Sequence, residues 1–261
     1  MTDADLIKIF TDPIKKCADY KPVFGTKKKN GVSLSEFRAL YGSDPLYSWV
    51  GLDSDYMYSA HKAAGGMTSF YRQLGIGCER LVREIIKSSL NINEDQANWS
   101  YEYTNPQEKK AKLSLDARID TNHLKDKARI SIINNWCKES LSTLNNNRAG
   151  IKGAVFEVRQ GYKSADSKRQ NADLRNAVRA YNEDYLPVVM VMSNQLNETI
   201  RSRYAGSQIL ILSGIMNGNN KECTYSFFKD IVGFDLEEFF KKNQKKIRAE
   251  IEGILYNLVQ P

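Results

Sequence analysis

The C-terminal half of the sequence alternates between strand-like and helix-like runs, and this alternation constrains the fold more than any other feature. As a strand, residues 153–160 (GAVFEVRQ) would place mainly apolar side chains on one face and both Glu157 and Arg159 on the other. Residues 186–192 (LPVVMVM) are almost continuously apolar, as expected of a strand that is buried on both faces. A third apolar run covers residues 208–212, and helical periodicity covers residues 167–181 and about 194–204 between the three runs. This order predicts an α/β fold with a central mixed β-sheet flanked by helices.

Helical patterns dominate the two ends of the chain, which predicts helical additions to this core. A chain of 261 residues is compatible with one large domain. We therefore expect a single domain over residues 1–261, with its core at about 70–215 and helical elaborations at 1–69 and 216–261. The other predicted elements are a helix within residues 1–20, a helical stretch over 55–90 that is interrupted near Gly65-Gly66 and near Gly75–Gly77, strands at 98–103 and 112–120, a helix at 126–144 and a mostly helical tail at 225–258.

Cysteine and histidine usage excludes several classes of site. The four cysteines are scattered along the chain without a CxxC pair, which argues against a structural zinc site. Free thiols are typical of the reducing cytoplasm. The chain has two histidines, His61 and His123, which are too few for a histidine-rich metal centre. If the chain is an enzyme, we expect its chemistry to depend on carboxylates, lysines and arginines.

Charge and hydropathy limit the partners and the location. Lysine and arginine number 38 against 31 acidic residues, a net charge of +7, which permits a polyanionic partner without requiring one. No uncharged apolar stretch approaches the roughly 18 residues that a membrane span needs. The N-terminal sequence MTDADLIKIF is acidic before it is apolar and does not resemble a signal peptide. We expect a cytoplasmic protein without a membrane segment.

Two carboxylates on the predicted strands are the strongest candidates for chemistry. Glu157 projects from the strand at 153–160 among apolar neighbours, where an unpaired carboxylate is costly. Asp116 lies within the predicted strand 112–120, and if these strands are neighbours, Asp116 and Glu157 lie side by side. Close carboxylates repel each other, and a divalent cation resolves the repulsion. With a basic residue nearby, such an arrangement favours cleavage of phosphodiester bonds by a metal-activated water.

The order of these residues resembles the PD-(D/E)XK nuclease superfamily, which has an Asp on one strand, a Glu two positions before a basic residue on the next strand, and then a helix. The segment 75–82 (GIGCERLV) resembles the first core helix of that fold, which often carries a glutamate near the site, here Glu79. The chain length and the additional helices resemble a type II restriction endonuclease, with the resemblance covering about residues 70–215. It implies a restriction-endonuclease-like core and a Mg²⁺ cofactor.

The resemblance also implies roles for individual residues. Asp116 and Glu157 are the expected catalytic carboxylates and metal ligands, and Asp120 is an alternative ligand because it shares a predicted strand face with Asp116. Arg159 stands where the family most often has lysine, so Lys163 is the expected catalytic amine and Arg159 is the alternative. A second departure from the family pattern is the gap between Asp116 and Glu157, which must hold a whole helix.

The resemblance implies double-stranded DNA as the partner and a homodimer whose two-fold symmetry matches a palindromic target. A cognate DNA methyltransferase is expected in the same system. The basic loop at 25–31 (GTKKKNG) is either a solvated turn or an arm that contacts phosphates. The predicted DNA-binding residues are Lys168, Arg169, Gln170, Asn171 and Arg175 on the helix at 167–181, and Lys62, Arg72 and Gln73 in an upstream surface.

Other interpretations of the same residues stay open. Glu157 with Arg159 or Lys163 could form a buried ion pair without a catalytic role, and Glu79 could belong to an ordinary charged helix face. The sequence is therefore also compatible with a non-catalytic nucleic-acid-binding module, with a structure-directed DNA repair nuclease that has the same core, and with a structural or interaction protein.

Overall fold

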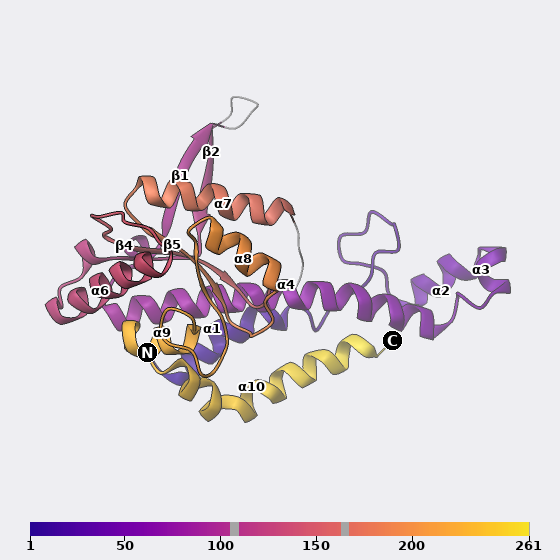
Figure 1. Ribbon diagram of the computed structural model, residues 1–261. Coiled ribbons are helices and arrows are strands. Elements are labelled where there is room, and N and C mark those ends of the chain that lie inside the picture. Colours follow the sequence, from indigo (N-terminus) through magenta and orange to yellow (C-terminus); the bar gives the residue numbers. More distant parts are fainter. Residues whose placement is uncertain (105–109, 163–166, 261) are drawn as a thin grey trace. The chain divides into compact units, whose positions relative to one another are not determined.

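The computed structural model describes residues 1–104, 110–162 and 167–260 of the chain. Within them, strands and helices alternate in the central part of the chain, and helices make up both end regions (Figure 1). The predicted mixed α/β architecture with helical N- and C-terminal additions is thus confirmed. None of the helices described combines the length and the apolar composition that a bilayer span requires.

The chain divides into two compact units. The first consists of Cys78–Lys241 and the N-terminal methionine, and the second consists of Thr2–Gly77 and the chain from Lys242 onward. The boundaries fall within helices α4 (Asp55–Leu90) and α10 (Leu236–Val259). That the whole chain forms one domain stays a prediction.

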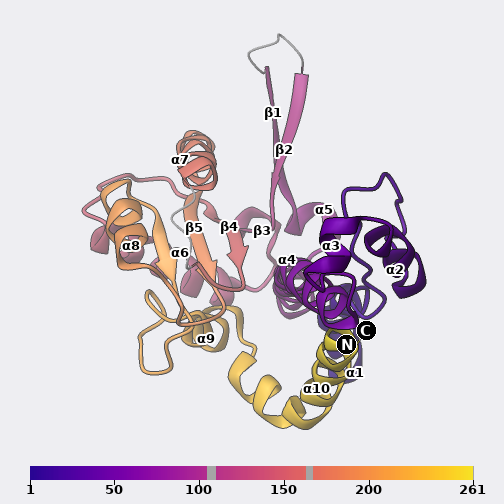
Figure 2. The same ribbon diagram turned by 90° about the vertical axis from the view of Figure 1, so that its right-hand side faces the viewer.

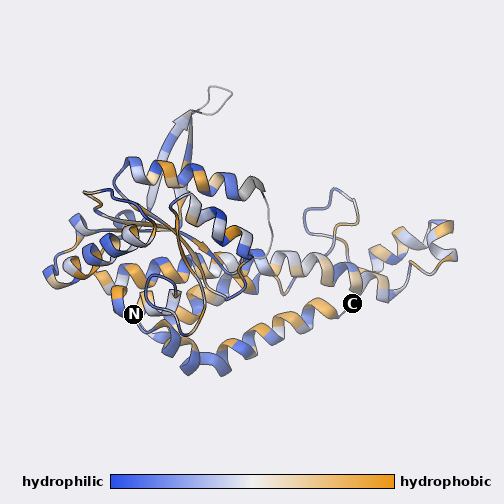
Figure 3. Cartoon of the chain, viewed as in Figure 1, coloured by the Kyte–Doolittle hydropathy of each residue, from blue (hydrophilic) through white to orange (hydrophobic). Residues whose placement is uncertain are grey.

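The first unit is built on a four-stranded sheet in the order β3–β4–β5–β6. Its strands are β3 (Ala117–Asp120), β4 (Gly153–Arg159), β5 (Leu186–Val191) and β6 (Leu210–Leu212). The strands β4, β5 and β6 are parallel, whereas β3 runs antiparallel to β4. All six residues of β5 are buried, as its apolar sequence predicts, and the strands of this sheet are strongly hydrophobic (Figure 3).

Helices cover both faces of this sheet. The helices of the unit, apart from the α4 and α10 segments, are α5 (Glu94–Ala97), α6 (Lys127–Thr143), α7 (Ser167–Asn182), α8 (Glu198–Gly206) and α9 (Thr224–Phe227), with the 3₁₀ helix η1 (Thr121–His123) and the π-helix η2 (Phe228–Val232). On one face the ring of Phe227 in α9 lies 5.5 Å from Phe156 of β4 and 4.8 Å from Trp136 of α6. On the other face α7 and α8 bury Ala177 and Tyr204 in one apolar cluster with β5. Figure 2 shows α7 above the strands and α9 below them.

Residues 110–120 form two strands, so the prediction of one continuous strand over 112–120 is wrong. The strands β1 (Trp99–Thr104) and β2 (Lys110–Leu115) pair with each other in a separate antiparallel sheet, and β3 begins only after Asp116. The reason is the side chain of Asp116, which accepts a hydrogen bond from the backbone of β4 in place of a backbone carbonyl. The break therefore occurs at the residue that the sequence singles out for chemistry.

The second unit is helical in the part of the chain that the structure describes. It contains α1 (Asp3–Lys15), α2 (Leu34–Gly42), α3 (Pro45–Trp49) and segments of α4 and α10. Its buried residues Val32, Phe37 and Tyr58 form an apolar cluster with neighbouring aromatic side chains.

Helix α4 runs without a break over 36 residues, so the predicted interruptions at its glycines are wrong. A Cβ atom at Gly65 would lie 2.1 Å from Oη of Tyr20, and one at Gly77 would lie 2.4 Å from the carbonyl oxygen of Phe10. These glycines therefore serve close packing. Glycine costs about 1 kcal/mol in a helix interior relative to alanine, and the packing that it allows offsets this cost.

Candidate metal and catalytic site

Asp116 is fixed at the junction between the two sheets. Its backbone N–H donates to the carbonyl of Phe156 over 3.0 Å, and its Oδ2 accepts the N–H of Val158 over 2.7 Å. The antiparallel register of β3 and β4 begins with the pair Ala117 and Phe156, so Asp116 precedes the paired residues. Its carboxylate instead contacts the backbone of Val158, the residue that follows Glu157, and its charge acts on the carboxylate of Glu157. These contacts support the prediction that the two carboxylates lie close together.

Glu157 is held by a buried cation. Nη2 of Arg159, two residues further along β4 on the same face, lies 2.7 Å from Oε1 of Glu157 and 3.0 Å from Oδ1 of Asp173 in α7. The exposed fractions are 14% for the Arg159 side chain, 17% for that of Glu157 and 3% for that of Asp173. Because the guanidinium bridges two carboxylates, its charge is already compensated within the protein.

Asp173 is in turn held by two phenol groups. Tyr204 of α8 donates to Oδ2 of Asp173 over 2.6 Å, and Tyr162 approaches the same oxygen at 3.2 Å. The two hydroxyl oxygens lie 2.8 Å apart. A chain of buried polar contacts thus runs from α8 through α7 to the carboxylate on β4.

The two neighbouring carboxylates are electrostatically costly when both are ionised. The pKa of Asp116 is raised to about 7, mainly by burial and also by the negative charge of Glu79. The hydrogen bond from the N–H of Val158 acts in the opposite direction. Burial, and then the carboxylate of Asp116, raises the pKa of Glu157 to about 8, although Arg159 opposes the shift. Near neutral pH the pair therefore favours a proton or an added cation between its members.

The donor set of this pair fits Mg²⁺. Magnesium takes oxygen ligands and is commonly held by one or two carboxylates, with water and substrate phosphates filling the other positions. Among the residues that the structure describes, no group of three or more His, Cys, Asp or Glu residues is arranged to hold a metal. Asp116 and Glu157 would therefore be the protein's share of such a site.

The structure does not bring Asp120 to this pair. It lies at the other end of β3, opposite Gly153 and four positions from Glu157 along β4. Its Oδ2 accepts the hydroxyl of Tyr185 over 2.7 Å, and its Oδ1 accepts the N–H of Asn122 over 2.9 Å. The carboxylate therefore caps η1 and holds a tyrosine. Lys163, the expected catalytic amine, lies outside the described residues.

The predicted DNA-binding residues fall into different environments. Gln170 is buried, and Arg203 of α8 binds its side chain over 2.6 Å and that of Asn171 over 2.8 Å. Arg175 is exposed on α7. Lys168 and Arg169 belong to the first turn of α7, and their side chains lie outside the description. In the second unit Arg72 is exposed, whereas Gln73 and Lys62 are half-buried.

The sequence-based prediction does not include the residues that hold Arg159 in place. Asp173 carries a detectable signal, because it shares a helical face of α7 with the buried Ala177 and Ala180, where an acidic residue needs a partner. Tyr204 carries no such signal, because its partner lies 31 residues away in the sequence.

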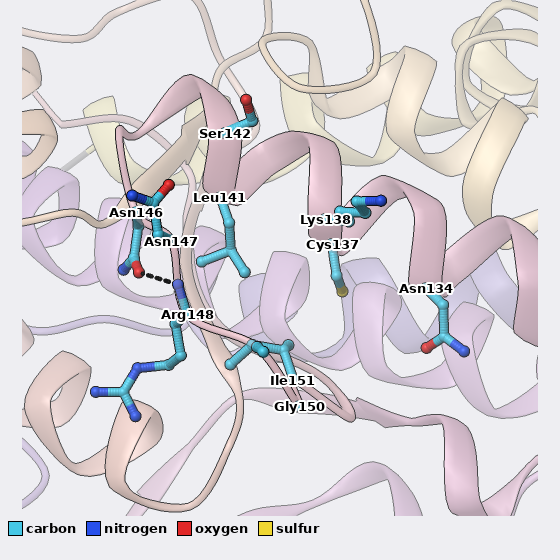
Figure 4. Close-up of a pocket in the computed structure, with 11 residues that line it drawn as sticks. Asn134, Cys137, Lys138, Leu141, Ser142, Asn146, Asn147, Arg148, Gly150 and Ile151 are labelled. Carbon is cyan, nitrogen blue, oxygen red and sulfur yellow. Dashed lines mark hydrogen bonds between the residues drawn. The ribbon is translucent and has the colours of Figure 1, made fainter.

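A separate cavity of about 510 Å³ lies between α6 and the loop at 146–151 (Figure 4). Cys137, Lys138 and Leu141 of α6 contribute to its wall, and neither Asp116 nor Glu157 lines it.

Comparison of the chain with protein-family models, with curated proteins and with solved structures returned no match.

Proposed function

We propose that this protein is a Mg²⁺-dependent nuclease that hydrolyses phosphodiester bonds of double-stranded DNA, in the manner of a type II restriction endonuclease. The observation that carries the proposal is the pair of half-buried carboxylates of Asp116 and Glu157. Asp116 is bonded to the backbone of Val158, next to Glu157, and both carboxylates have raised pKa values. These are the properties expected of carboxylates that share a divalent cation.

The order of elements supports the same proposal. Glu79 lies on α4, Asp116 directly precedes β3, Glu157 and Arg159 lie on β4, and α7 follows. This is the order on which the resemblance to the PD-(D/E)XK superfamily rests. Sequence-specific cleavage, a homodimer and a cognate methyltransferase come from that resemblance and are part of the proposal.

Each residue of the site would have a distinct role. Asp116 and Glu157 hold the cation, which activates a water and offsets charge on the phosphate when it is bound. Arg159 keeps the carboxylate of Glu157 in place, and Asp173 keeps Arg159 in place. Because the charge of Arg159 is compensated by two carboxylates, the proposal assigns the amine that orients the water to Lys163 rather than to Arg159.

A set of matched variants tests the proposal. Supercoiled plasmid and several phage genomes are incubated with the protein in Mg²⁺ and in EDTA. We expect the wild type to cleave in Mg²⁺ alone, and Asp116→Asn and Glu157→Gln to abolish cleavage while remaining folded. Glu139→Gln, which neutralises an exposed carboxylate on α6, is the control and should cleave like the wild type. Full cleavage by a folded Glu157→Gln variant would refute the proposal.

One observation favours a second candidate, a DNA-binding module without catalytic activity. Glu157, Arg159 and Asp173 form a buried ion-pair network, and such a network can serve structure alone. In that case Mg²⁺ would not raise the melting temperature of the wild type, whereas the nuclease proposal predicts a rise that Glu157→Gln removes.

A further inference from the structure

A basic groove on the second unit combines a hollow shape with several lysines. Two hollows, of about 580 and 400 Å³, adjoin each other because they share Lys21, Asn30 and Ser33 in their walls. The loop between α1 and α2 forms one side, and Tyr58 and Lys62 of α4 contribute to the other. We call this feature the basic groove, and its lysines are Lys21, Lys28, Lys29 and Lys62.

The carboxylates of the groove do not balance these lysines. Glu36 is bound by Lys28 over 2.5 Å and accepts the backbone N–H of Ser33 over 2.8 Å. The other carboxylate in the wall is Asp19. Among the ion pairs of the described residues, none involves the three remaining lysines of the groove.

Two of these like charges, on Lys21 and Lys62, lie close enough to affect each other. Nζ of Lys62 donates to the carbonyl of Gln260 over 3.0 Å, which fixes the amine in the wall. Burial is the main cause that lowers the pKa of Lys62, and the positive charge of Lys21 lowers it further. Cations that converge on a hollow repel each other and focus a positive potential there. An anion placed between them would remove this repulsion.

We propose that the basic groove binds the phosphate backbone of double-stranded DNA through Lys21, Lys29 and Lys62. The groove itself supports phosphate groups as the ligand, and the choice of DNA as their source rests on the proposed function. Lysine amines are mobile point charges that suit phosphates. Backbone contacts of this kind position DNA without reading its sequence. The second unit therefore supplies affinity for any sequence, and the loop at 25–31 is a phosphate-contacting arm.

The salt dependence of DNA binding tests the groove. The full chain is titrated with a short DNA duplex in EDTA at several salt concentrations. Lys21→Gln/Lys29→Gln removes two exposed groove lysines, and Lys62→Gln is then added. The matched control, Lys245→Gln/Lys246→Gln, removes two exposed lysines of α10 outside the groove. Each lost phosphate contact reduces the slope of log K against log salt by about 0.9, so the groove double variant should lose about 1.8 and the control should keep the wild-type slope.

The possible outcomes separate the groove from the nuclease proposal. If the slope is unchanged in the groove variants, or if the control loses as much of the slope as they do, the groove does not bind the DNA backbone. This holds even if the wild type cleaves DNA. Binding that depends on the groove, without cleavage in Mg²⁺, supports the groove and overturns the nuclease. A wild type that does not bind DNA overturns both. If inorganic phosphate binds the wild type as tightly as the duplex does, and the groove variants lose only phosphate, the groove takes a free anion and its assignment to DNA is wrong.

Discussion

Neutralising Asp116 should stabilise the metal-free protein at pH 8. Asp116→Asn keeps the shape of the side chain and an oxygen that can accept the N–H of Val158, which now bonds to Oδ2 over 2.7 Å. The change removes a charge whose cost from burial and Glu79 exceeds the stabilisation that it gains from Val158, Arg159 and Arg83. A substitution that abolishes the proposed activity is therefore expected to increase stability.

The magnitude follows from the pKa of Asp116, which rises from 3.8 to about 7 on folding. At about 1.4 kcal/mol per pKa unit, the ionised carboxylate costs at most about 4 kcal/mol at pH 8. We expect a measured gain of about 1–3 kcal/mol, because solvent and side chains rearrange around a buried charge. The folded-state pKa lies above the unfolded value, so the wild type keeps this stability below about pH 4 and loses it as the pH rises through about 7.

The assay is urea unfolding of both proteins in EDTA, followed by circular dichroism between pH 4 and pH 8. The difference in unfolding free energy should be small at pH 4 and should grow in favour of Asp116→Asn up to pH 8. Glu139→Gln should follow the wild type at every pH. A variant that is less stable than the wild type at pH 8, or a difference that does not change with pH, would show that the charge of Asp116 does not destabilise the folded protein.

Other substitutions and reagents test separate parts of the structure. Asp173→Asn should lower the unfolding free energy by about 2–4 kcal/mol in urea, because a buried guanidinium loses a charged partner, and an unchanged transition midpoint would contradict this. Tyr204→Phe should cost about 1–2 kcal/mol in the same assay, since a buried hydrogen bond to a carboxylate is lost. Asp120→Asn should lower the melting temperature but leave Mg²⁺-dependent cleavage per folded molecule intact; lost cleavage with normal melting would make it a ligand. Burial raises the pKa of Cys78 and of Cys137 to about 12, so these thiols should react with a thiol reagent only in denaturant, and fast labelling of the native protein at pH 8 would argue against their burial. Because unfolded thiols ionise near pH 8.5, the unfolding free energy should fall as the pH rises above about that value.

The elements predicted best are those whose pattern is local. The apolar run 186–192 predicts β5, and the run 153–160, with one mainly apolar face, predicts β4, in each case to within one residue at either end. Period-2 and period-3.6 patterns are properties of the segment itself, so no knowledge of neighbours is needed. The helix expected at 167–181 ends one residue later in the structure.

The failures occur where a distant partner decides the local structure. The glycines of α4 do not break the helix, because Tyr20 and Phe10 pack into the space that they leave. Asp116 ends a strand because its carboxylate finds an N–H of β4. In both cases the deciding contact joins residues far apart in the sequence, which a single sequence does not reveal.

The candidate site also combines residues that a sequence pattern predicts with residues that depend on tertiary packing. The strand patterns predict that Asp116 and Glu157 lie near each other, although Asp116 precedes β3 and does not lie within a strand. The sequence predicts Asp120 as an alternative ligand because one continuous strand would carry Asp116 and Asp120 on the same face, and the break after Leu115 separates the two. The partners of Arg159 could not be predicted, because they depend on how α7 and α8 pack onto the sheet.

Digestion of a phage genome by the purified wild-type protein, with the products separated on a gel, tests the proposed nuclease activity most directly. We expect discrete bands in Mg²⁺ and intact DNA in EDTA, because Asp116 and Glu157 would need the cation to act. Intact DNA in Mg²⁺ on several genomes, from protein that is folded and binds DNA, would contradict the proposed activity.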